Sequence, residues 1–369
     1  MFREAARRFI ATEITPFHGE WEKVGVVPRE LWRKAGDAGL LCPNVPAEFG
    51  GPGANFLYNV VITEELGRAG ATGPQFTVHS DMVASYILSF GTEEQKKKWL
   101  PGMVSGETIG ALGLTEPGGG SDLKALRTRA VRDGDHYVID GQKTYISNGQ
   151  LCDLVVLACK TDPEAGARGV SLIVVETSRE GFQRGRMLEK LGLKAQDTSE
   201  LFFTGVRVPI ANRLGEEGAG FKMAMHKLAH ERLIIAVNAV ATCEAVLEWT
   251  VSYTKERKAF GKLIAEFQNT RFKVAELTAL VQGVRVFVDR CIELAVDNRL
   301  DSTDAAMAKM VTSELQCRVV DECLQFFGGY GYTLDFPIAH AYIDARVRRI
   351  AGGSSEVMRE IISRKVFDG

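Results

Sequence analysis

Residues 127–147 read RTRAVRDGDHYVIDGQKTYIS, and in this stretch polar and apolar residues alternate. The dipeptides Asp133-Gly134 and Asp140-Gly141 interrupt the alternation, and such dipeptides favour tight turns between antiparallel strands. A period of two places successive side chains on opposite faces of a strand. The stretch therefore predicts that a β-sheet begins in the middle of the chain.

Three further strands follow the same stretch. They are LVVLACK from residue 154, GVSLIVVE from 169 and LFFTGVRVP from 201. Their spacing, with loops such as 161–168 between them, is typical of an antiparallel all-β unit. Of the 38 glycines in the chain, 17 fall in residues 110–220, which agrees with a turn-rich middle region.

Helical patterns flank this sheet on both sides. Before it we expect an amphipathic helix ending before Pro16, helices over 30–39 and 58–69, and a helix opened by the Thr92/Gln95 capping box and closed by Pro101. After Gly220 the patterns predict helices over about 221–256, 263–297, 303–327 and 338–349, and a last helix from Ser354. The chain of 369 residues exceeds the size of one core, so we expect three packed units: 1–110, 111–219 and 220–369. The predicted fold class is α+β, mostly α.

The composition narrows the possible partners. With 45% apolar and 25% charged residues, the chain has the profile of a folded, water-soluble protein. A net charge of −2 offers no electrostatic footprint for nucleic acid. The longest apolar runs, 154–159 and 233–237, are far shorter than the ~18 residues of a membrane span. We therefore expect neither nucleic-acid binding nor a membrane span, and residues 1–14 match neither a signal nor a transit peptide.

The cysteines and histidines indicate no metal site. Seven cysteines form no CxxC pair, which argues against disulfides and zinc and favours a reducing compartment. His226 and His230 have helical spacing, but the residue after His226 is not the glutamate of a zinc-protease helix. We interpret them as two polar residues on a helix.

Two glycine-rich segments are candidates for ligand contact. TEPGGGSD at 115–122 matches neither a dinucleotide nor a P-loop fingerprint, and it is either a flexible turn or a loop whose amides approach a cofactor. IAGGSSEVMREII at 350–362 begins a helix, where free N–H groups favour an anion or a polarised carbonyl. The alternative is an ordinary capped helix with Glu356 in its first turn.

Glu231 is the most unusual carboxylate in the sequence. On a helix it shares a face with Leu228 and Ile235, and the stretch LIIAVNAVA after it is apolar nearly all round. Burial raises the pKa of a carboxyl towards neutrality, which suits a general base acting on a weakly acidic carbon. The alternative is a structural ion pair with Lys227 or with a partner elsewhere in the chain, since the adjacent Arg232 points away and is a poor local partner.

Several motifs together resemble the acyl-CoA dehydrogenase family over essentially the whole chain. They are ALGLTEPGGGSD (111–122), KTYISNG (143–149), ERKAFGK (256–262), QFFGGYGY (325–332) and GGSSEVMREI (352–361). HSDMVASYI (79–87), GLKAQDTSELFF (192–203), HERLIIA (230–236) and RLDS (299–302) are most similar to the long-chain branch. The resemblance implies an N-terminal helical domain, a middle β-barrel-like domain and a C-terminal four-helix bundle.

The resemblance implies FAD-dependent α,β-dehydrogenation of a fatty acyl-CoA to a trans-2-enoyl-CoA. A base removes the pro-R α-proton, and a hydride passes from the β-carbon to flavin N5. The thioester oxygen is held by the backbone N–H of Gly352 and a ribityl hydroxyl of FAD. In many members the catalytic base is a glutamate at the position where this chain has Gly352. In the long-chain and isovaleryl branches the base comes instead from an E-R dipeptide, which here is Glu231-Arg232. The resemblance therefore assigns Glu231 as the base.

The same resemblance names cofactor and substrate contacts. The residues expected along FAD are Leu112, Leu114, Thr115, Gly120, Ser121, Tyr145, Ile146, Ser147, Arg257, Phe260, Gln268, Gln325, Gly328, Gly329, Ser354 and Glu356. Those expected at the CoA thioester are Ser121, Ala229, Arg232, Gly352 and Gly353. Ala229 stands where many members have an aspartate, which removes one hydrogen bond to the pantetheine arm. In the family, residues such as Arg257 and Gln325 reach across a subunit boundary, which implies a homotetramer built as a dimer of dimers.

The resulting hypothesis is a long-chain acyl-CoA dehydrogenase that passes electrons to an electron-transferring flavoprotein. A branched- or medium-chain enzyme with the same base is the alternative within the class. A non-catalytic acyl-CoA binding protein, or an oxidase or monooxygenase on the same scaffold, are the alternatives outside it. We expect the bacterial cytoplasm as its location, with the mitochondrial matrix as the alternative.

Overall fold

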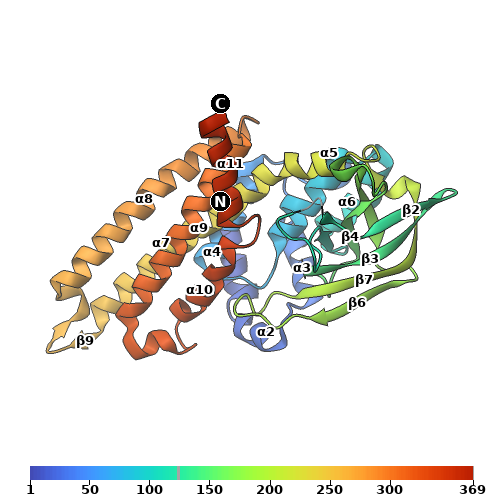
Figure 1. Cartoon of the computed structure of the whole chain (residues 1–369). Helices are drawn as coiled ribbons and strands as arrows, with labels where there is room; N and C mark the ends of the chain where they lie inside the picture. Colours follow the sequence, from blue (N-terminus) through green and yellow to red (C-terminus); the bar gives the residue numbers. More distant parts are fainter. Residues whose placement is uncertain (123–124, 369) are drawn as a thin grey trace.

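The computed structural model describes residues 1–122 and 125–368, which form the three regions that Figure 1 shows. The sheet occupies one end of the molecule, the long C-terminal helices occupy the other, and the N-terminal helices pack beside both. The helices are α1 Phe2–Phe9, α2 His18–Val24, α3 Arg29–Asp37, α4 Phe56–Arg68, α5 Ser85–Phe90, α6 Glu93–Ser105, α7 Gly220–Glu256, α8 Gln268–Val296, α9 Ser302–Phe327, α10 Pro337–Ala345 and α11 Ser355–Asp368. The strands are β1 Gly110–Gly113, β2 Arg129–Asp133, β3 His136–Ser147, β4 Leu154–Lys160, β5 Val170–Glu176, β6 Phe182–Met187, β7 Thr198–Pro209, β8 Arg213–Leu214, β9 Lys258–Ala259 and β10 Lys262–Leu263.

The N-terminal helices largely match their sequence patterns. The first helix continues through a wider helical turn to Ile14 and ends before Pro16, as predicted. The Thr92/Gln95 capping box is present at the start of α6. The prediction that Pro101 closes α6 is wrong, because the helix continues to Ser105. Pro101 lies on an exposed face with Lys97, so the carbonyl that loses its helical hydrogen bond faces solvent.

The middle region is a mixed sheet with the strand order β6-β7-β3-β2-β4-β5-β8, and β1 pairs with β4. The prediction of an all-antiparallel unit is wrong, because β1 runs parallel to β4. The β2–β3 hairpin separates these two strands in sequence, and this long connection lets the chain return in the same direction. The sequence pattern missed β6, an exposed edge strand without a buried face, and it placed the start of β7 too late.

The C-terminal helices surround α7. Apolar residues of α7, α8, α9 and α10 form one core cluster, which Val60 of α4 joins. The predicted helix over 263–297 begins only at Gln268, because Lys262–Leu263 pairs with Lys258–Ala259 as a hairpin and a tight turn follows. The predicted fold class, with helices, a sheet and helices in that order, is confirmed. The predicted domain boundaries at 110 and 219 stay a prediction.

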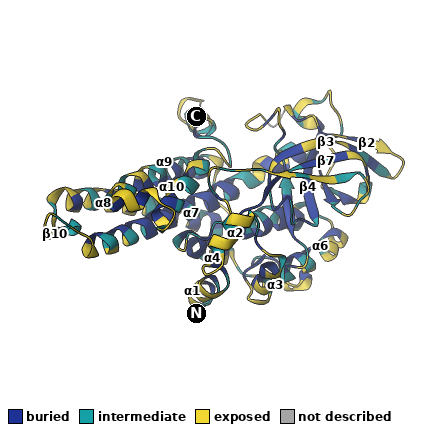
Figure 2. Cartoon of the chain, turned by 90° about the horizontal axis from the view of Figure 1, so that it is seen from below, coloured by how far each residue is buried: buried dark blue, intermediate teal, exposed yellow. Residues whose placement is uncertain are grey.

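The long helix α7 is the central core element of the molecule. Among the described residues it is the one helix long and apolar enough, by length and composition, to cross a membrane. However, 72% of its most apolar window is buried inside the protein, and Figure 2 shows α7 as largely buried. Its apolar character is therefore that of a core helix, and its burial explains how a side chain on it can be kept from water.

Candidate active site

Glu231 is buried on α7, with 4% of its surface exposed. Its Oε1 is buried and has no hydrogen-bond partner among residues 1–122 and 125–368. Burial raises the pKa of this carboxyl to about 7, although Tyr86, Arg232 and Lys227 oppose the shift. Among residues 1–122 and 125–368, Lys227 and Glu231 form no ion pair within 4 Å; the Lys227 ammonium lies 5.7 Å from the centre of the Phe90 ring and acts on the carboxylate only through its charge. A buried carboxyl with a raised pKa and a free oxygen is a candidate general base.

Tyr86 of α5 is the aromatic residue that faces Glu231. Its hydroxyl is buried and lacks a hydrogen bond of ordinary geometry in the described part of the chain. Burial and the nearby Glu231 carboxylate raise the pKa of the Tyr86 hydroxyl well above its usual value. Tyr86 also belongs to the core cluster against which Leu112 and Leu114 pack. Through Tyr86, Glu231 therefore lies beside the same apolar cluster as the loop that is expected to hold the flavin.

The glycine turn that precedes α11 approaches α7 one helical turn after Glu231. Gly352 and Gly353 have φ values of +69° and +95°, a region that favours glycine. A Cβ at residue 352 would clash with Cδ1 of Ile235, and one at residue 353 would lie 3.9 Å from Nη2 of Arg232. The turn thus offers bare backbone amides close to the Glu231-Arg232 dipeptide, and a side chain at 352 would be strained by the positive φ and would have to displace the end of Ile235.

Arg232 supplies a buried positive charge beside this turn. Its Nη1 donates a 3.5 Å hydrogen bond to the hydroxyl of Ser302, and its buried Nε has no partner among the residues that the structure places. Burial lowers the pKa of the guanidinium, and the neighbouring Glu231 carboxylate opposes that shift. A ligand with acceptor oxygens would satisfy this guanidinium, as expected for a residue at the CoA thioester.

The glycine-rich loop after β1 is held by a buried ion pair that the sequence analysis missed. Lys143 of β3 lies 2.8 Å from Oε1 of Glu116 and also donates to the carbonyl of Leu114 at 3.1 Å. The Glu116 carboxylate accepts the backbone N–H groups of Arg127 and Thr128. Burial would raise the pKa of Glu116, but the Lys143 ammonium and these donors outweigh burial and lower it. These bonds therefore anchor the start of the loop, at Leu114 and Glu116, to β3.

Tyr145 presents an exposed aromatic ring next to this loop. The register of β3 against β7 shifts between Lys143 and Ile146, and Tyr145 has a φ of +59° there. A bulge of this kind re-aims a side chain, and 69% of the surface of Tyr145 is exposed. The hydroxyl of Ser147 accepts a 2.6 Å hydrogen bond from the side chain of Gln196. The Ile146 side chain is buried in the sheet core, so only its backbone can meet a cofactor.

The remaining predicted contacts fall into two groups. Leu112, Leu114 and Thr115 are half-buried, Gly120 and Ser121 are exposed, and all five lie on β1 or the loop after it. Ala229 is buried on α7, Ser354 precedes α11, and the exposed Glu356 lies in its first turn. A second group lies elsewhere: Arg257, Phe260, Gln268, Gln325, Gly328 and Gly329, all exposed.

This second group lies at the far end of the C-terminal helices, around β9, away from β3 (Figure 1). Phe260 is 96% exposed with a φ of +52°, and the Arg257 guanidinium lies 5.7 Å from the centre of the Tyr330 ring. Gln325 and Tyr332 line a surface cavity of about 530 Å³. The single chain therefore does not bring the two groups of predicted cofactor residues together.

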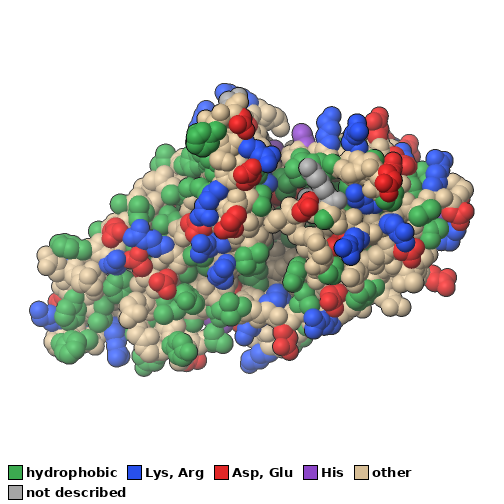
Figure 3. Space-filling model, viewed as in Figure 1, with side chains coloured by type: hydrophobic (Ala, Val, Ile, Leu, Met, Phe, Trp, Pro, Cys, Tyr) green, Lys and Arg blue, Asp and Glu red, His purple; other side chains and the backbone are tan. Residues whose placement is uncertain are grey.

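The residues around Glu231 and Tyr145 fit a flavin and an acyl thioester. An unpartnered buried carboxylate oxygen, a glycine turn with positive φ and an exposed aromatic ring are each features that a bound ligand would explain. The surface in Figure 3 is hollowed between the C-terminal helices and the sheet, on the side of the loop that joins α10 to α11.

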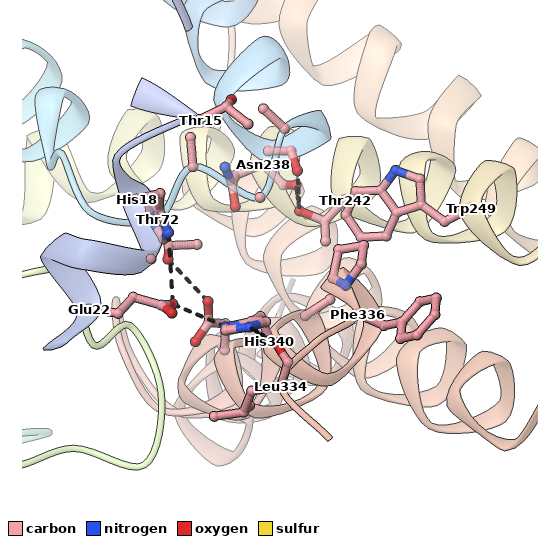
Figure 4. Close-up of a pocket in the computed structure, with 18 of the residues that line it drawn as sticks. Thr15, His18, Glu22, Thr72, Asn238, Thr242, Trp249, Leu334, Phe336 and His340 are labelled. Atoms are coloured by element: carbon pink, nitrogen blue, oxygen red, sulfur yellow. Dashed lines mark hydrogen bonds and ion pairs between the residues drawn. The ribbon is translucent and has the colours of Figure 1, made fainter. Parts of the chain in front are cut away.

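Another cavity, of about 420 Å³, lies where α2 and the end of α4 meet α7 and α10. Figure 4 shows His18 and Glu22 of α2 directed towards His340 of α10. Nδ1 of His340 lies 3.1 Å from Oε1 of Glu22, and none of the predicted site residues lines this cavity. It is a feature of the contact between the N-terminal and C-terminal helices and is separate from the proposed acyl-CoA site.

Comparison with known proteins decides the family. Three family models match in order: the acyl-CoA dehydrogenase N-terminal domain at residues 1–107, the middle domain at 111–206 and the C-terminal domain at 218–367. The chain belongs to the acyl-CoA dehydrogenase family. The predicted recognition is therefore confirmed, and as a member of this family the chain is an FAD-dependent flavoprotein oxidoreductase of fatty acid metabolism.

Individual acyl-CoA dehydrogenases show how similar the chain is to its relatives. The mitochondrial long-chain specific acyl-CoA dehydrogenase of Mus musculus is 48% identical, over 99% of this chain and 86% of that protein. The short-chain specific enzyme of Clostridium acetobutylicum is 37% identical, over 100% of this chain and 97% of that protein. An acyl-CoA dehydrogenase structure from Geobacillus kaustophilus has a TM-score of 0.98 at 48% identity, covering 100% and 97% of the two chains. A structure described as the electron transferring flavoprotein of Acidaminococcus fermentans has a TM-score of 0.95 at 35% identity, with the same coverage.

Proposed function

We propose that this acyl-CoA dehydrogenase oxidises long-chain fatty acyl-CoA to trans-2-enoyl-CoA, with Glu231 as the base. The observation that carries the proposal is the buried Glu231 carboxylate, which has an unpartnered oxygen and lies one helical turn from the contact between α7 and the Gly352-Gly353 turn. A base with a pKa of about 7 is partly ionised at neutral pH and has enough proton affinity to take a proton from carbon.

The chain's own residues would lower the barrier in two ways. The backbone N–H of Gly352 would donate to the thioester oxygen, where negative charge grows as the α-proton leaves. The apolar surroundings of Glu231 keep water from the carboxylate, so that it need not shed a hydration shell before it reacts. When bound, FAD supplies the acceptor for the electron pair that leaves the β-carbon.

The proposed cofactor contacts follow the two groups described above. Tyr145 would cover one face of the flavin, and Ser147, fixed by Gln196, would lie near its reactive edge. The loop from Leu112 to Ser121 would follow the ring and the ribityl chain. Arg257 and Gln325 lie at the opposite end of the molecule from Tyr145. They would therefore contact the diphosphate and adenosine of an FAD molecule whose flavin ring is bound by a second subunit. This division supports a homotetramer arranged as a dimer of dimers.

The preference for long acyl chains rests on the relatives. The long-chain specific relative is 48% identical to this chain, whereas the short-chain specific one is 37% identical. Branched- and medium-chain substrates are the alternative with the same base.

The electron acceptor we propose is an electron-transferring flavoprotein, in keeping with the family and with the A. fermentans structure. Relatives occur in mitochondria and in bacteria, so a cytoplasmic location stays a prediction.

An anaerobic titration tests the proposal. Purified protein with FAD is mixed with acyl-CoA of increasing chain length, including a branched C5 substrate, and the flavin absorbance is followed. We expect bleaching that is fastest with long straight chains. Faster bleaching with the branched substrate would reject the long-chain assignment, and no bleaching with any acyl-CoA would reject catalysis. Rapid peroxide formation in air would instead favour an oxidase.

A further inference from the structure

Lys309 of α9 is a buried lysine that neither the sequence motifs nor the proposed mechanism uses. Its side chain has no exposed surface, and its ammonium donates a 2.6 Å hydrogen bond to the carbonyl oxygen of Gly353. It forms no ion pair with a carboxylate among the residues that the structure describes. A buried charge is costly unless it makes a specific contact, and here that contact is a backbone carbonyl of the glycine turn.

The turn needs such support because it consists of two consecutive residues with positive φ. Gly352 and Gly353 have the greatest backbone freedom of any residue type, and little in their own sequence fixes the conformation. Two side chains of α9 hold the C-terminal end of this turn. The Lys309 ammonium donates a hydrogen bond to the Gly353 carbonyl, and Glu314 accepts a 2.6 Å hydrogen bond from the hydroxyl of Ser355. On the other side, the turn rests against Ile235 and Arg232 of α7.

The charges around the turn are distributed unequally. Glu314 is already engaged by Ser355 and by Arg349 at 2.9 Å, whereas Lys309 and Arg232 have no such carboxylate partner in the described part of the chain. Burial lowers the pKa of Lys309 to about 8, and the neighbouring Arg232 charge adds to that shift. Two cations thus flank the turn at which the thioester oxygen is expected to gain negative charge, and preorganised charge of this kind stabilises a transition state.

We infer that Lys309 is a positioning residue for α-proton removal: its ammonium fixes the Gly353 carbonyl and thereby holds the Gly352-Gly353 amides in place for the thioester oxygen. This inference rests on the proposed function. Lys309 does not touch the substrate. It sets the geometry of the turn and adds a positive charge behind it.

The experiment compares Lys309→Met with the wild type and with Thr312→Val, a control on the same buried side of α9. Among the described residues the Thr312 hydroxyl donates to the backbone carbonyls of Ala308 and Lys309 on its own helix, so the control perturbs α9 but leaves the Lys309 ammonium on the turn. FAD content and Tm report on folding. The dissociation constant of an enoyl-CoA reports on binding, and the anaerobic rate of flavin reduction reports on catalysis.

A 3-thia acyl-CoA gives a measurement that would stay unchanged if Lys309 had only a structural role. Its α-proton is more acidic than that of a substrate, so its enolate forms in the site and gives a long-wavelength absorbance with the flavin. We expect Lys309→Met to slow reduction about 30-fold, to change the enoyl-CoA dissociation constant less than threefold, and to raise the pH midpoint of this band by about one unit, a tenfold loss in enolate stability. Thr312→Val should match the wild type in all three measurements.

The possible outcomes separate this inference from the proposed function. If Lys309→Met reduces as fast as the wild type with an unchanged midpoint, or if its rate falls only in proportion to lost FAD, Lys309 has no positioning role. If Lys309→Met does not retain FAD, Lys309→Gln is measured instead, and its remaining N–H donor should give an intermediate midpoint. If the wild type itself is not bleached by acyl-CoA, the proposed function fails, whatever the variants do.

Discussion

Ile235 lies against Gly352 so closely that a Cβ at residue 352 would overlap with its Cδ1. Ile235 follows Glu231 by one helical turn, so the same face of α7 carries the proposed base and contacts the facing glycine turn. The contact places the glycine turn one helical turn from the proposed base.

Gly352→Ala should therefore damage both stability and catalysis. The new methyl group meets Ile235 in a backbone conformation that disfavours side chains, and together these effects should cost about 2–4 kcal/mol of unfolding free energy. Flavin reduction should slow by more than tenfold as the turn shifts. Thermal unfolding and stopped-flow reduction measure the two effects.

The control for this substitution is Gly205→Ala. Gly205 also has a positive φ, of +61°, but a Cβ there meets nothing within 4 Å. It should cost only about 1 kcal/mol of left-handed strain and leave reduction unchanged. Equal effects of the two substitutions would show that contact with Ile235 does not matter.

Removing one partner of the Lys143–Glu116 pair should loosen the loop that is expected to hold the flavin. Lys143→Met leaves a buried carboxylate facing only N–H donors, and breaking a buried pair typically costs about 3–5 kcal/mol. We expect a lower Tm and a weakened hold on FAD, measured as the flavin-to-protein absorbance ratio after gel filtration. The double variant Lys143→Met/Glu116→Gln should recover part of the stability. A single variant that keeps its Tm and its FAD would contradict the anchoring role.

Glu231 should make the protein less stable at high pH than it would be without the carboxylate. Its pKa is raised from 4.5 to about 7 in the folded state, so the folded protein binds the proton more tightly than the unfolded chain does. The contribution of this one carboxyl to the free energy of unfolding is therefore largest below about pH 4.5, and it falls by about 3 kcal/mol as the pH rises to about 7. Glu231→Gln should accordingly raise the Tm at pH 8 and have a smaller effect at pH 5. A variant that is less stable than the wild type at pH 8 would show that the carboxylate is not strained by burial.

The contact between α2 and α10 should respond to pH in the opposite direction. The hydrogen bond from His340 to Glu22 raises the pKa of His340 from 6.5 to about 8. The stability that protonated His340 contributes is complete below pH 6.5 and is lost as the pH rises through about 8. Because the pair is partly exposed, the contribution should be about 1 kcal/mol. His340→Gln should therefore lower the Tm at pH 6 and have little effect at pH 9, and an equal loss at both pH values would exclude the charged contact.

Much of this architecture could be predicted from local sequence patterns, because helices and strands differ in their hydrophobic period. The burial of Glu231 also followed from the apolar residues around it on one helix. Residues that meet across long stretches of chain could not be predicted in this way. Glu116 and Lys143 each look like a surface charge in sequence, and their pairing depends on the way β1 and β3 come together. Tyr86 and Lys309 likewise gain their surroundings only from packing against α7 and the glycine turn.

The most direct test of the account is the anaerobic reduction of Glu231→Gln by a long-chain acyl-CoA. Glutamine keeps the shape of the side chain but cannot accept the α-proton, so the flavin should stay yellow, with FAD bound as in the wild type. Glu248→Gln, a change to an exposed residue on the same helix, should bleach at the wild-type rate. Bleaching of Glu231→Gln within tenfold of the wild-type rate would contradict the assignment of Glu231 as the base.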